Sequence, residues 1–268
     1  LIANGTCNQT ITLREPTGLS HFQFFMPPTS TVSCSHVNIR GSKAIGGANF
    51  TATNSSDLSS NLGWTFSNTA SNHYWVNNQG NWDDPSHWSY TSGGSGGACI
   101  PKIFDNVYFD ANSFSSSNDS VLIDSNDIFC QNMDWTGATG NPIFSFQSNI
   151  YTHYISGSMK LIRPMTFIME NETFFVWTQL NKTIDMAGNF YNGNIIFCDS
   201  GQWTLLDTLF VKSTLYHHFG GLIANQKPIY TESYWGTYDK TKTLNIQNTT
   251  VNIIKGGPMR IFSWVKSS

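Results

Sequence analysis

Apolar and polar residues alternate along short segments of the chain, most clearly after residue 143. Apolar side chains separated by one polar residue are typical of a strand that buries one face. No long window keeps apolar residues at the i, i+3, i+4 and i+7 positions of an amphipathic helix. The pattern therefore predicts an all-β protein with little helix. The clearest pairs are Ile195 and Phe197, Trp203 and Leu205, Leu209 and Val211, Leu244 and Ile246, and Val251 and Ile253.

Turn-forming residues separate these strands at short intervals, each long enough for one edge of a coil. Two-residue hairpin turns of the Asn-Gly or Asp-Gly type are few, which argues against an antiparallel sandwich. Apolar, Asn and Thr positions recur in successive segments, and stacking of coils into side-chain ladders would explain this recurrence. We therefore predict a right-handed parallel β-solenoid, with β-sandwich modules as the alternative. The turns are marked by Gly188, Asn192-Gly193, Gly201, Gly220-Gly221, Gly236 and Gly256-Gly257.

Tryptophans are concentrated in residues 74–90, where Trp75, Trp82 and Trp88 fall within fourteen positions. A Gly/Ser hinge follows at residues 92–97, and then a strand is predicted over residues 105–109. The end of a coil stack exposes backbone donors and acceptors unless a cap covers them. We expect the Trp-rich segment to be that cap, so that its tryptophans are structural.

Composition narrows the class of protein. Only 12% of the 268 residues are charged, against roughly 25% in an ordinary soluble domain. Abundant Asn, Ser, Thr, Gly and aromatic residues suit an extracellular all-β protein in contact with sugars or other proteins. The net charge of −3 and the lack of a Lys/Arg run argue against a nucleic-acid partner. The apolar runs are too short for membrane insertion.

Five cysteines occur at positions 7, 34, 99, 130 and 198, without the spacing of a zinc site. Pairs within each half of the chain are plausible in an oxidising compartment, namely Cys7 with Cys34 and Cys99 with Cys130. Cys198 then lies outside either pair. The alternative is that these cysteines are buried free thiols, because sequence does not report Cα separations.

Five segments of the chain form a specific series. Residues 74–114 run from YWVNNQGNWDDPSHWS to DNVYFDANSF, and residues 46–66 read GGANFTATNSSDLSSNLGWTF. CQNMDWTGATGNP follows at 130–142, GQWTLLDTL at 201–209 and TKTLNIQNTTVNI at 241–253. Together they resemble the repeat modules of giant adhesin-like surface proteins that gliding bacteria secrete, with residues 74–114 similar to a module start and residues 46–66 to a module end. The chain departs from the family pattern at Asn77-Asn78, where glycines are common, and at Cys99, where a small aliphatic residue is common. The second departure favours a local disulfide with Cys130.

The resemblance implies a division of the chain into two parts. Residues 1–72 would be the C-terminal end of one module and residues 73–268 the N-terminal part of the next. It further implies a non-enzymatic structural and adhesive repeat of a large protein, exported by type IX secretion, displayed on the cell surface and used for attachment or gliding. Its expected partners are neighbouring repeats, the secretion and gliding machinery, and an extracellular surface or polysaccharide. In Asp207-Thr208-Leu209, Thr208 is similar to the O-glycosylation site of such bacteria.

A carbohydrate-binding module is the first alternative function, because exposed aromatic rings can stack on sugars. The aromatic candidates are Trp177, Trp203, Tyr234, Trp235 and Tyr238. Trp203 alternates with Leu205, which predicts a core position. Tyr234, Trp235 and Tyr238 lie in a Gly-containing segment, which we predict to be an exposed loop that binds sugar.

Metal and catalytic sites are weaker hypotheses. Asp105, Asn106 and Asp110 could offer oxygen ligands to calcium, although Asp and Asn are equally expected in turns; we expect no other cofactor. A solenoid polysaccharide lyase or hydrolase would need grouped carboxylates and bases. Asp83 and Asp84 fit turn capping better, and the adjacent His217 and His218 fit surface or edge positions. We expect solvated side chains at Lys160, Arg163, Glu170 and Glu172, and we predict no catalytic residues.

Overall fold

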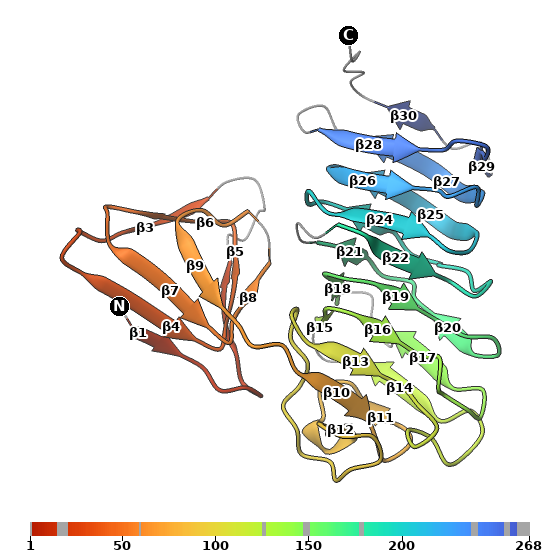
Figure 1. Cartoon of the computed structure of the whole chain (residues 1–268), viewed down its shortest axis with the longest axis horizontal. Helices are drawn as coiled ribbons and strands as arrows, with labels where there is room; N and C mark the ends of the chain where they lie inside the picture. Colours follow the sequence, from red (N-terminus) through yellow and green to blue (C-terminus); the bar gives the residue numbers. More distant parts are fainter. Residues whose placement is uncertain are drawn as a thin grey trace.

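The computed structural model describes residues 2–14, 21–58, 60–124, 127–146, 151–176, 180–236, 241–254 and 258–261. They form short strands and a single 3₁₀ turn, Pro85–His87, and no α-helix occurs in these ranges. Every pair of strands except β10 with β12 is parallel. Parallel coils stacked on one another make a β-solenoid, so the predicted fold class is confirmed and the β-sandwich alternative is wrong (Figure 1).

The first unit, residues 2–67, is a short stack of three-sided coils. Its core is small and contains Val32, Cys34, Val37, Ile39 and Phe50. The sheets of this unit contain β1 (Ile2–Asn4), β4 (Thr31–Ser35), β7 (Asn49–Thr53) and β9 (Trp64–Ser67) on one side; β2 (Ile11–Arg14), β5 (Val37–Arg40) and β8 (Ser56–Asp57) on the second; and β3 (Phe22–Phe25) with β6 (Ser42–Ile45) on the third.

The second unit begins at β10 and is a longer stack with three faces. Its nine-stranded sheet contains, in spatial order, β12 (Trp88–Ser89), β10 (Asn72–Trp75), β13 (Asn106–Tyr108), β16 (Met133–Asp134), β19 (Met159–Lys160), β22 (Lys182–Asp185), β24 (Gln202–Leu205), β26 (Gly220–Ile223) and β28 (Lys242–Asn245). The next sheet contains β11 (Gly80–Asn81), β14 (Ser120–Ile123), β17 (Ile143–Phe146) and β20 (Thr166–Ile168). The third contains β15 (Ile128–Cys130), β18 (His153–Ile155), β21 (Thr173–Phe175), β23 (Ile195–Phe197), β25 (Leu209–His217), β27 (Ile229–Gly236), β29 (Val251–Ile253) and β30 (Met259–Ile261).

Among the described strands, no sheet combines β1–β9 with later strands, so the two units are separate stacks joined by residues 68–71. The interpretation of these units as the tail and head of repeat modules stays a prediction. Figure 1 shows the first stack beside the lower part of the second, with β10, β11 and β12 at the lower end of the long stack.

In-register stacking places equivalent side chains directly above one another. In the core of the second unit, Phe109 stacks on Trp135 with ring centroids 3.6 Å apart, and Phe175 stacks on Phe197 at 5.1 Å. One continuous apolar cluster runs from Trp75 to Tyr234. Trp203 and Leu205 both belong to it, as their alternation predicts.

Polar ladders also follow the coils. Asn106 Nδ2 donates to Asn72 Oδ1 at 3.0 Å, and Asn132 Nδ2 donates to Asn106 Oδ1 at 2.6 Å. Each side-chain amide therefore finds a hydrogen-bond partner in the next coil, which suits a surface with few charged groups. The expectation that recurring Asn positions stack is confirmed at these three residues.

The Trp-rich segment closes the first coil of the second unit. Strand β12 pairs antiparallel with β10 and occupies the edge of the nine-stranded sheet, where a further coil would otherwise stack. Trp75, Trp82 and Trp88 are at most 1% exposed, and the Trp88 ring lies 5.1 Å from Trp75 and 4.8 Å from Trp82. Their predicted structural role in the cap is confirmed.

Removing one cap ring tests this role. Trp88→Ala leaves a large cavity and frees the Trp82 carbonyl that accepts from the indole Nε1, so we expect a loss of about 3–5 kcal/mol in unfolding free energy. Phe25→Ala is the control, because Phe25 is 70% exposed and its removal should change stability by about 0.5 kcal/mol or less. Urea denaturation measures both; equal losses would contradict the cap.

Candidate functional site

The two stacks meet along a seam that polar and covalent contacts hold together. A disulfide joins Cys7 to Cys99, with Cα atoms 5.5 Å apart. Ile100 N donates to Asn8 Oδ1 at 2.9 Å beside this bond. Further along the seam, an Arg40 nitrogen donates to the Tyr154 hydroxyl at 3.4 Å. The first unit is therefore fixed to the flank of the second.

This disulfide corrects both predicted cysteine pairs. Cys7 and Cys99 pair with each other across the units, whereas Cys34 and Cys130 are buried free thiols in separate cores. The prediction paired cysteines within each half because sequence proximity was its guide. Cys198 is in no disulfide, as expected.

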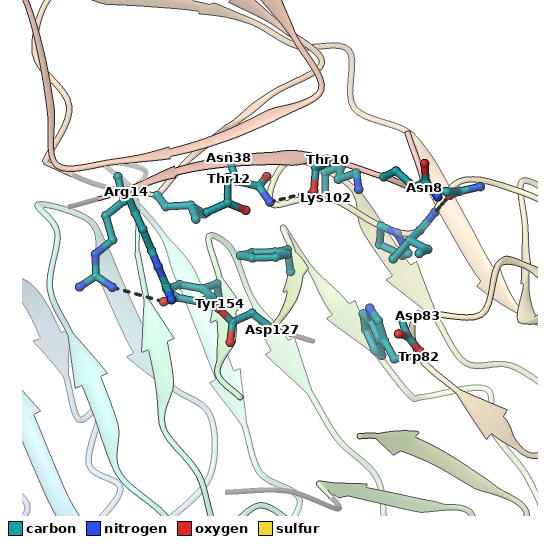
Figure 2. A pocket seen from close by; sticks show the side chains of 16 residues that line it. Asn8, Thr10, Thr12, Arg14, Asn38, Trp82, Asp83, Lys102, Asp127 and Tyr154 are labelled. Carbon is teal, nitrogen blue, oxygen red and sulfur yellow. Dashed lines mark hydrogen bonds between the residues drawn. The ribbon is translucent and has the colours of Figure 1, made fainter. Parts of the chain in front are cut away.

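A cavity of about 280 Å³ lies in the seam, and we call it the seam cavity (Figure 2). Strands β2 and β5 of the first unit form one wall, and the start of the second unit forms the other. Its lining combines amides, hydroxyls, cationic and anionic groups, and aromatic rings. The lining residues are Asn8, Gln9, Thr10, Thr12, Arg14, Asn38, Arg40, Leu58, Trp82, Asp83, Ile100, Pro101, Lys102, Asp127, Phe129 and Tyr154.

Burial changes the acidity of several groups in this lining. Desolvation lowers the pKa of Lys102 to about 8, an effect that Asp105 partly offsets. Burial also raises the pKa of Asp127, although Arg14 and Arg40 and a hydrogen bond from Thr152 N act in the opposite direction. The pKa of the Tyr154 hydroxyl rises to about 12, mainly by burial. A ligand here would meet charged groups in a partly desolvated setting, where their interactions are stronger than in water.

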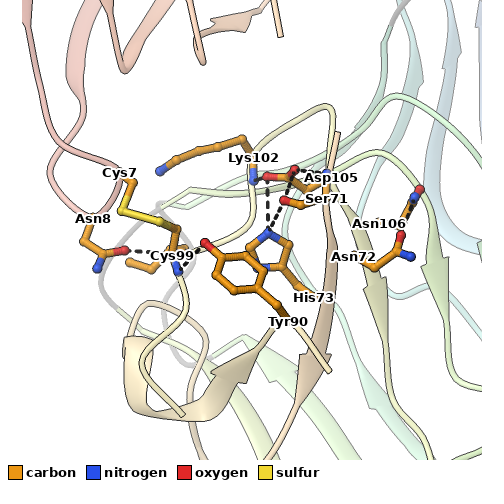
Figure 3. Close-up of polar contacts among 11 residues, drawn as sticks. Cys7, Asn8, Ser71, Asn72, His73, Tyr90, Cys99, Lys102, Asp105 and Asn106 are labelled. Atoms are coloured by element: carbon orange, nitrogen blue, oxygen red, sulfur yellow. Dashed lines mark hydrogen bonds and ion pairs between the residues drawn. A yellow bond between two sulfur atoms is a disulfide. The ribbon is translucent and has the colours of Figure 1, made fainter. Parts of the chain in front are cut away.

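A polar cluster of Ser71, His73 and Asp105 lies to one side of the disulfide, and both line a second cavity of about 180 Å³ (Figure 3). Ser71 Oγ donates to Asp105 Oδ1 at 2.8 Å and lies 2.9 Å from His73 Nε2. Asp105 also accepts from Ser71 N and Lys102 N. The carboxylate thus ties the chain before β10 to the chain before β13.

The same three residue types form catalytic triads, but their arrangement here differs. In a triad the carboxylate and the hydroxyl contact opposite nitrogens of the imidazole. Here His73 Nε2 lies 3.6 Å from Asp105 Oδ2 and 2.9 Å from Ser71 Oγ, so both groups meet the same nitrogen. The hydroxyl is held by the carboxylate and is not activated by the ring. This cluster is an anchor of the fold.

The predicted sugar-binding loop is wrong for Tyr234. That residue lies in β27 with 1% exposure, and its hydroxyl is 2.7 Å from His217 Nδ1 in the core. Trp235 is partly exposed, and its ring centroid lies 6.4 Å from that of Tyr216. Tyr238 and Trp177 lie outside the described residues. The structure therefore does not support a platform formed by these aromatic rings.

The three calcium candidates are held apart. Asp105 directly precedes β13 (Asn106–Tyr108) and Asp110 lies two residues after it; five residue steps of extended chain span about 16 Å at about 3.3 Å per residue. The Asp105 carboxylate binds Ser71 and Lys102, and Asp110 Oδ1 accepts from Asn112 N. Asn106 belongs to the amide ladder. Within the described ranges, no three His, Cys, Asp or Glu side chains are grouped to hold a metal ion.

The remaining candidates have mostly structural positions. Asp84 caps the 3₁₀ turn by accepting from Ser86 N, as expected for a turn carboxylate, while Asp83 lines the seam cavity. The loose charged group is exposed, as predicted. Its members are Lys160, Arg163, Glu170 and Glu172.

The prediction of surface or edge positions for the two adjacent histidines is wrong for His217, which is fully buried. Its burial follows from the alternation of β25, which places Leu215 and His217 on the inner face. The Nε2 atom of His217 lies 3.1 Å from Gly220 O. The next residue, His218, is half-buried.

Thr208 is partly exposed in the turn between β24 and β25, beside an Asp207 carboxylate that accepts from Thr208 N. O-glycosylation at this residue stays a prediction.

The sequence patterns gave no sign of the seam cavity. Its lining comes from residues between positions 8 and 154, in both units. None of its charged residues forms a local motif, and only the fold places them together.

Comparison with protein-family models, curated proteins and solved structures gives no match. Within the described residues, no helix is long and apolar enough to cross a bilayer.

The cysteine arrangement predicts a distinctive peptide map. Digestion without reductant should release a peptide joining Cys7 to Cys99. Cys34 and Cys130 should resist alkylation in the native protein, because they are at most 1% exposed and burial raises the pKa of both thiols. Both should react once the protein is unfolded in denaturant. A Cys7–Cys34 or Cys99–Cys130 peptide would contradict the structure.

Two buried histidines predict a loss of stability in acid. Desolvation lowers the pKa of His153 to about 3 and that of His217 to about 4, so the folded state favours the neutral rings. Below the unfolded pKa of about 6.5, the unfolded chain binds protons that the folded chain does not. As the pH falls through about 5, between the unfolded and folded pKa values, each histidine should cost at most about 1.4 kcal/mol per pH unit.

Denaturation curves at several pH values measure this slope. His153→Leu should lower the slope by up to about 1.4 kcal/mol per pH unit, whereas His21→Gln, at an exposed position, should leave it unchanged. If NMR titration of the parent protein gives both buried rings a pKa near 6.5, the account is wrong irrespective of how the variants fold.

Proposed function

We propose that this chain is a non-enzymatic structural and adhesive segment of a larger secreted surface protein, used for attachment or gliding. The observation that carries the proposal is the unbroken core from Trp75 to Tyr234. In a solenoid each coil packs on its neighbours, so adding coils extends the same core without changing its cross-section. Such a segment supplies length and stiffness.

The placement of the polar groups agrees with this role. Among the candidate polar residues, Asp84, Asp105 and Asn106 are engaged in caps, anchors or ladders. Few charged side chains and a disulfide between the units suit an extracellular setting. The resemblance of the sequence to repeat modules of gliding-bacterial adhesins supports export by type IX secretion and display on the cell surface.

The seam cavity favours a second function, carbohydrate binding. Its amides, hydroxyls and aromatic rings are the groups with which proteins orient polar ligands in a pocket. A binding pocket is compatible with an adhesive role, because adhesion needs a receptor contact.

The size and location of the native polypeptide test the main proposal. Peptides of this chain should map to a polypeptide far larger than 29.9 kDa, and brief protease treatment of intact cells should release them. A mature protein of about this mass that stays inside cells would overturn the proposal. An intracellular protein of similar abundance serves as the control for cell lysis.

A further inference from the structure

We propose that the seam cavity binds a carboxylated sugar, a uronic acid residue at the end or within a polysaccharide. This inference deepens the adhesive function proposed above by naming the ligand class, although the binding itself is measurable on the isolated protein. Unpaired polar atoms, local charge and the mixed lining of the cavity favour such a ligand.

Two buried polar atoms of the lining have no hydrogen-bond partner among the described residues: the acceptor Asn38 Oδ1 and the donor Trp82 Nε1. Asn38 is 5% exposed and Trp82 is 1% exposed. A buried polar group without a partner is unfavourable, so a ligand hydroxyl that reaches either atom would gain a hydrogen bond. The Asn38 amide is held by a hydrogen bond from its Nδ2 to Thr10 Oγ1 at 3.2 Å (Figure 2).

Beside β2 and β5 two cations outnumber one carboxylate, in a chain whose net charge is −3. Arg14 and Arg40 both act on the Asp127 carboxylate, whereas Lys102 is opposed by Asp105. One positive charge is left beside Asp127, which a single carboxylate of a ligand would neutralise. Guanidinium groups bind carboxylates with two parallel hydrogen bonds, so the arginines are suited to this contact.

The rest of the lining indicates a ligand that also carries hydroxyl groups. A hydroxyl both donates and accepts, and the cavity offers donors and acceptors in the amides of Asn8, Gln9 and Asn38 and the hydroxyls of Thr10 and Thr12. The Asp127 carboxylate can accept hydrogen bonds from sugar hydroxyls. Aromatic rings such as Phe129 offer apolar area to a sugar ring. A uronic acid combines one carboxylate with several hydroxyls.

Both units are needed for this site. Arg14, Arg40 and Asn38 lie on β2 and β5, whereas Lys102, Asp127 and Tyr154 belong to the second unit. Arg40 is already positioned by Tyr154, and its guanidinium carbon lies 5.7 Å from the centre of the Phe174 ring. Arg14 is the exposed arginine of the pair, and we assign it the main contact with the sugar carboxylate.

Titration with trigalacturonate and triglucuronate tests the site, with neutral trisaccharides of galactose and glucose as probes without the carboxylate. Calorimetry should show saturable binding of at least one acidic trisaccharide and at least tenfold weaker binding of its neutral counterpart. In NMR spectra the indole N–H signal of Trp82 should shift on binding. Absence of saturable binding, or equal binding of the neutral probe, overturns the proposal.

Variants locate the binding in the seam cavity. Arg14→Gln should weaken binding about tenfold, the effect expected for a lost charge-assisted contact of about 1.4 kcal/mol. Thr12→Trp, at an exposed position, should block the cavity and abolish binding without disturbing either core. Lys43→Gln removes an exposed charge outside the cavity and should leave the affinity unchanged. Full affinity in Arg14→Gln or Thr12→Trp would refute the site.

The outcome for the site and the outcome for the adhesive role are separable. A giant surface-displayed chain whose purified segment binds no acidic sugar would retain the structural role and lose the proposed ligand. If the chain instead binds uronate but comes from a small intracellular protein, the proposed binding site stands and the proposed adhesive role is wrong.

Discussion

The structure depends on one constraint, which is that successive coils of a parallel solenoid must stack in register. In the second unit, in-register stacking aligns the apolar positions of successive coils into one core and the Asn72, Asn106 and Asn132 amides into one ladder. Because each coil is held by its neighbours, the first coil would lack a partner on one side. The antiparallel strand β12 and the rings of Trp75, Trp82 and Trp88 close that side. The same stacking that gives the molecule its length therefore makes the Trp-rich cap necessary.

The seam is a second level of organisation, because it joins two stacks whose sheets are separate. Its Cys7–Cys99 bond spans 92 residues of sequence, and the Ser71–His73–Asp105 anchor holds the chain where the second stack begins. These contacts place β2 and β5 opposite the flank of the longer stack and so form the seam cavity. The cavity lies between the two units, so the disulfide that joins them also holds the two walls of the proposed binding site together.

The sequence could predict the local pattern but not the long-range pairing. Alternation such as that of Trp203 and Leu205 revealed strands with one buried face, and the shortage of hairpin turns revealed that these strands stack in parallel. The cysteine pairing was missed because a disulfide needs two Cα atoms that are close in space. Local sequence does not show which positions of the two units lie close together. Tyr234 was misplaced because Gly236 indicated a loop, whereas Ile229–Gly236 form strand β27, whose inner face changes between Thr231 and Tyr234 where its register with β25 shifts. An irregularity of this kind reverses side-chain direction without leaving an obvious signal. The seam residues come from positions too far apart for any motif.

Force spectroscopy on the single chain, pulled from its ends, tests the mechanical claim most directly. From β13 to β28 one coil takes between 19 residues, as from Gln202 to Gly221, and 26 residues, as from Val107 to Met133. The account predicts successive rupture steps of about 7–9 nm, one coil each at about 3.5 Å per residue. It also predicts about 30 nm of additional extension once reductant opens the 92-residue loop. A single all-or-none unfolding event, or an extension that reductant does not change, would contradict an element built of stacked coils locked at the seam.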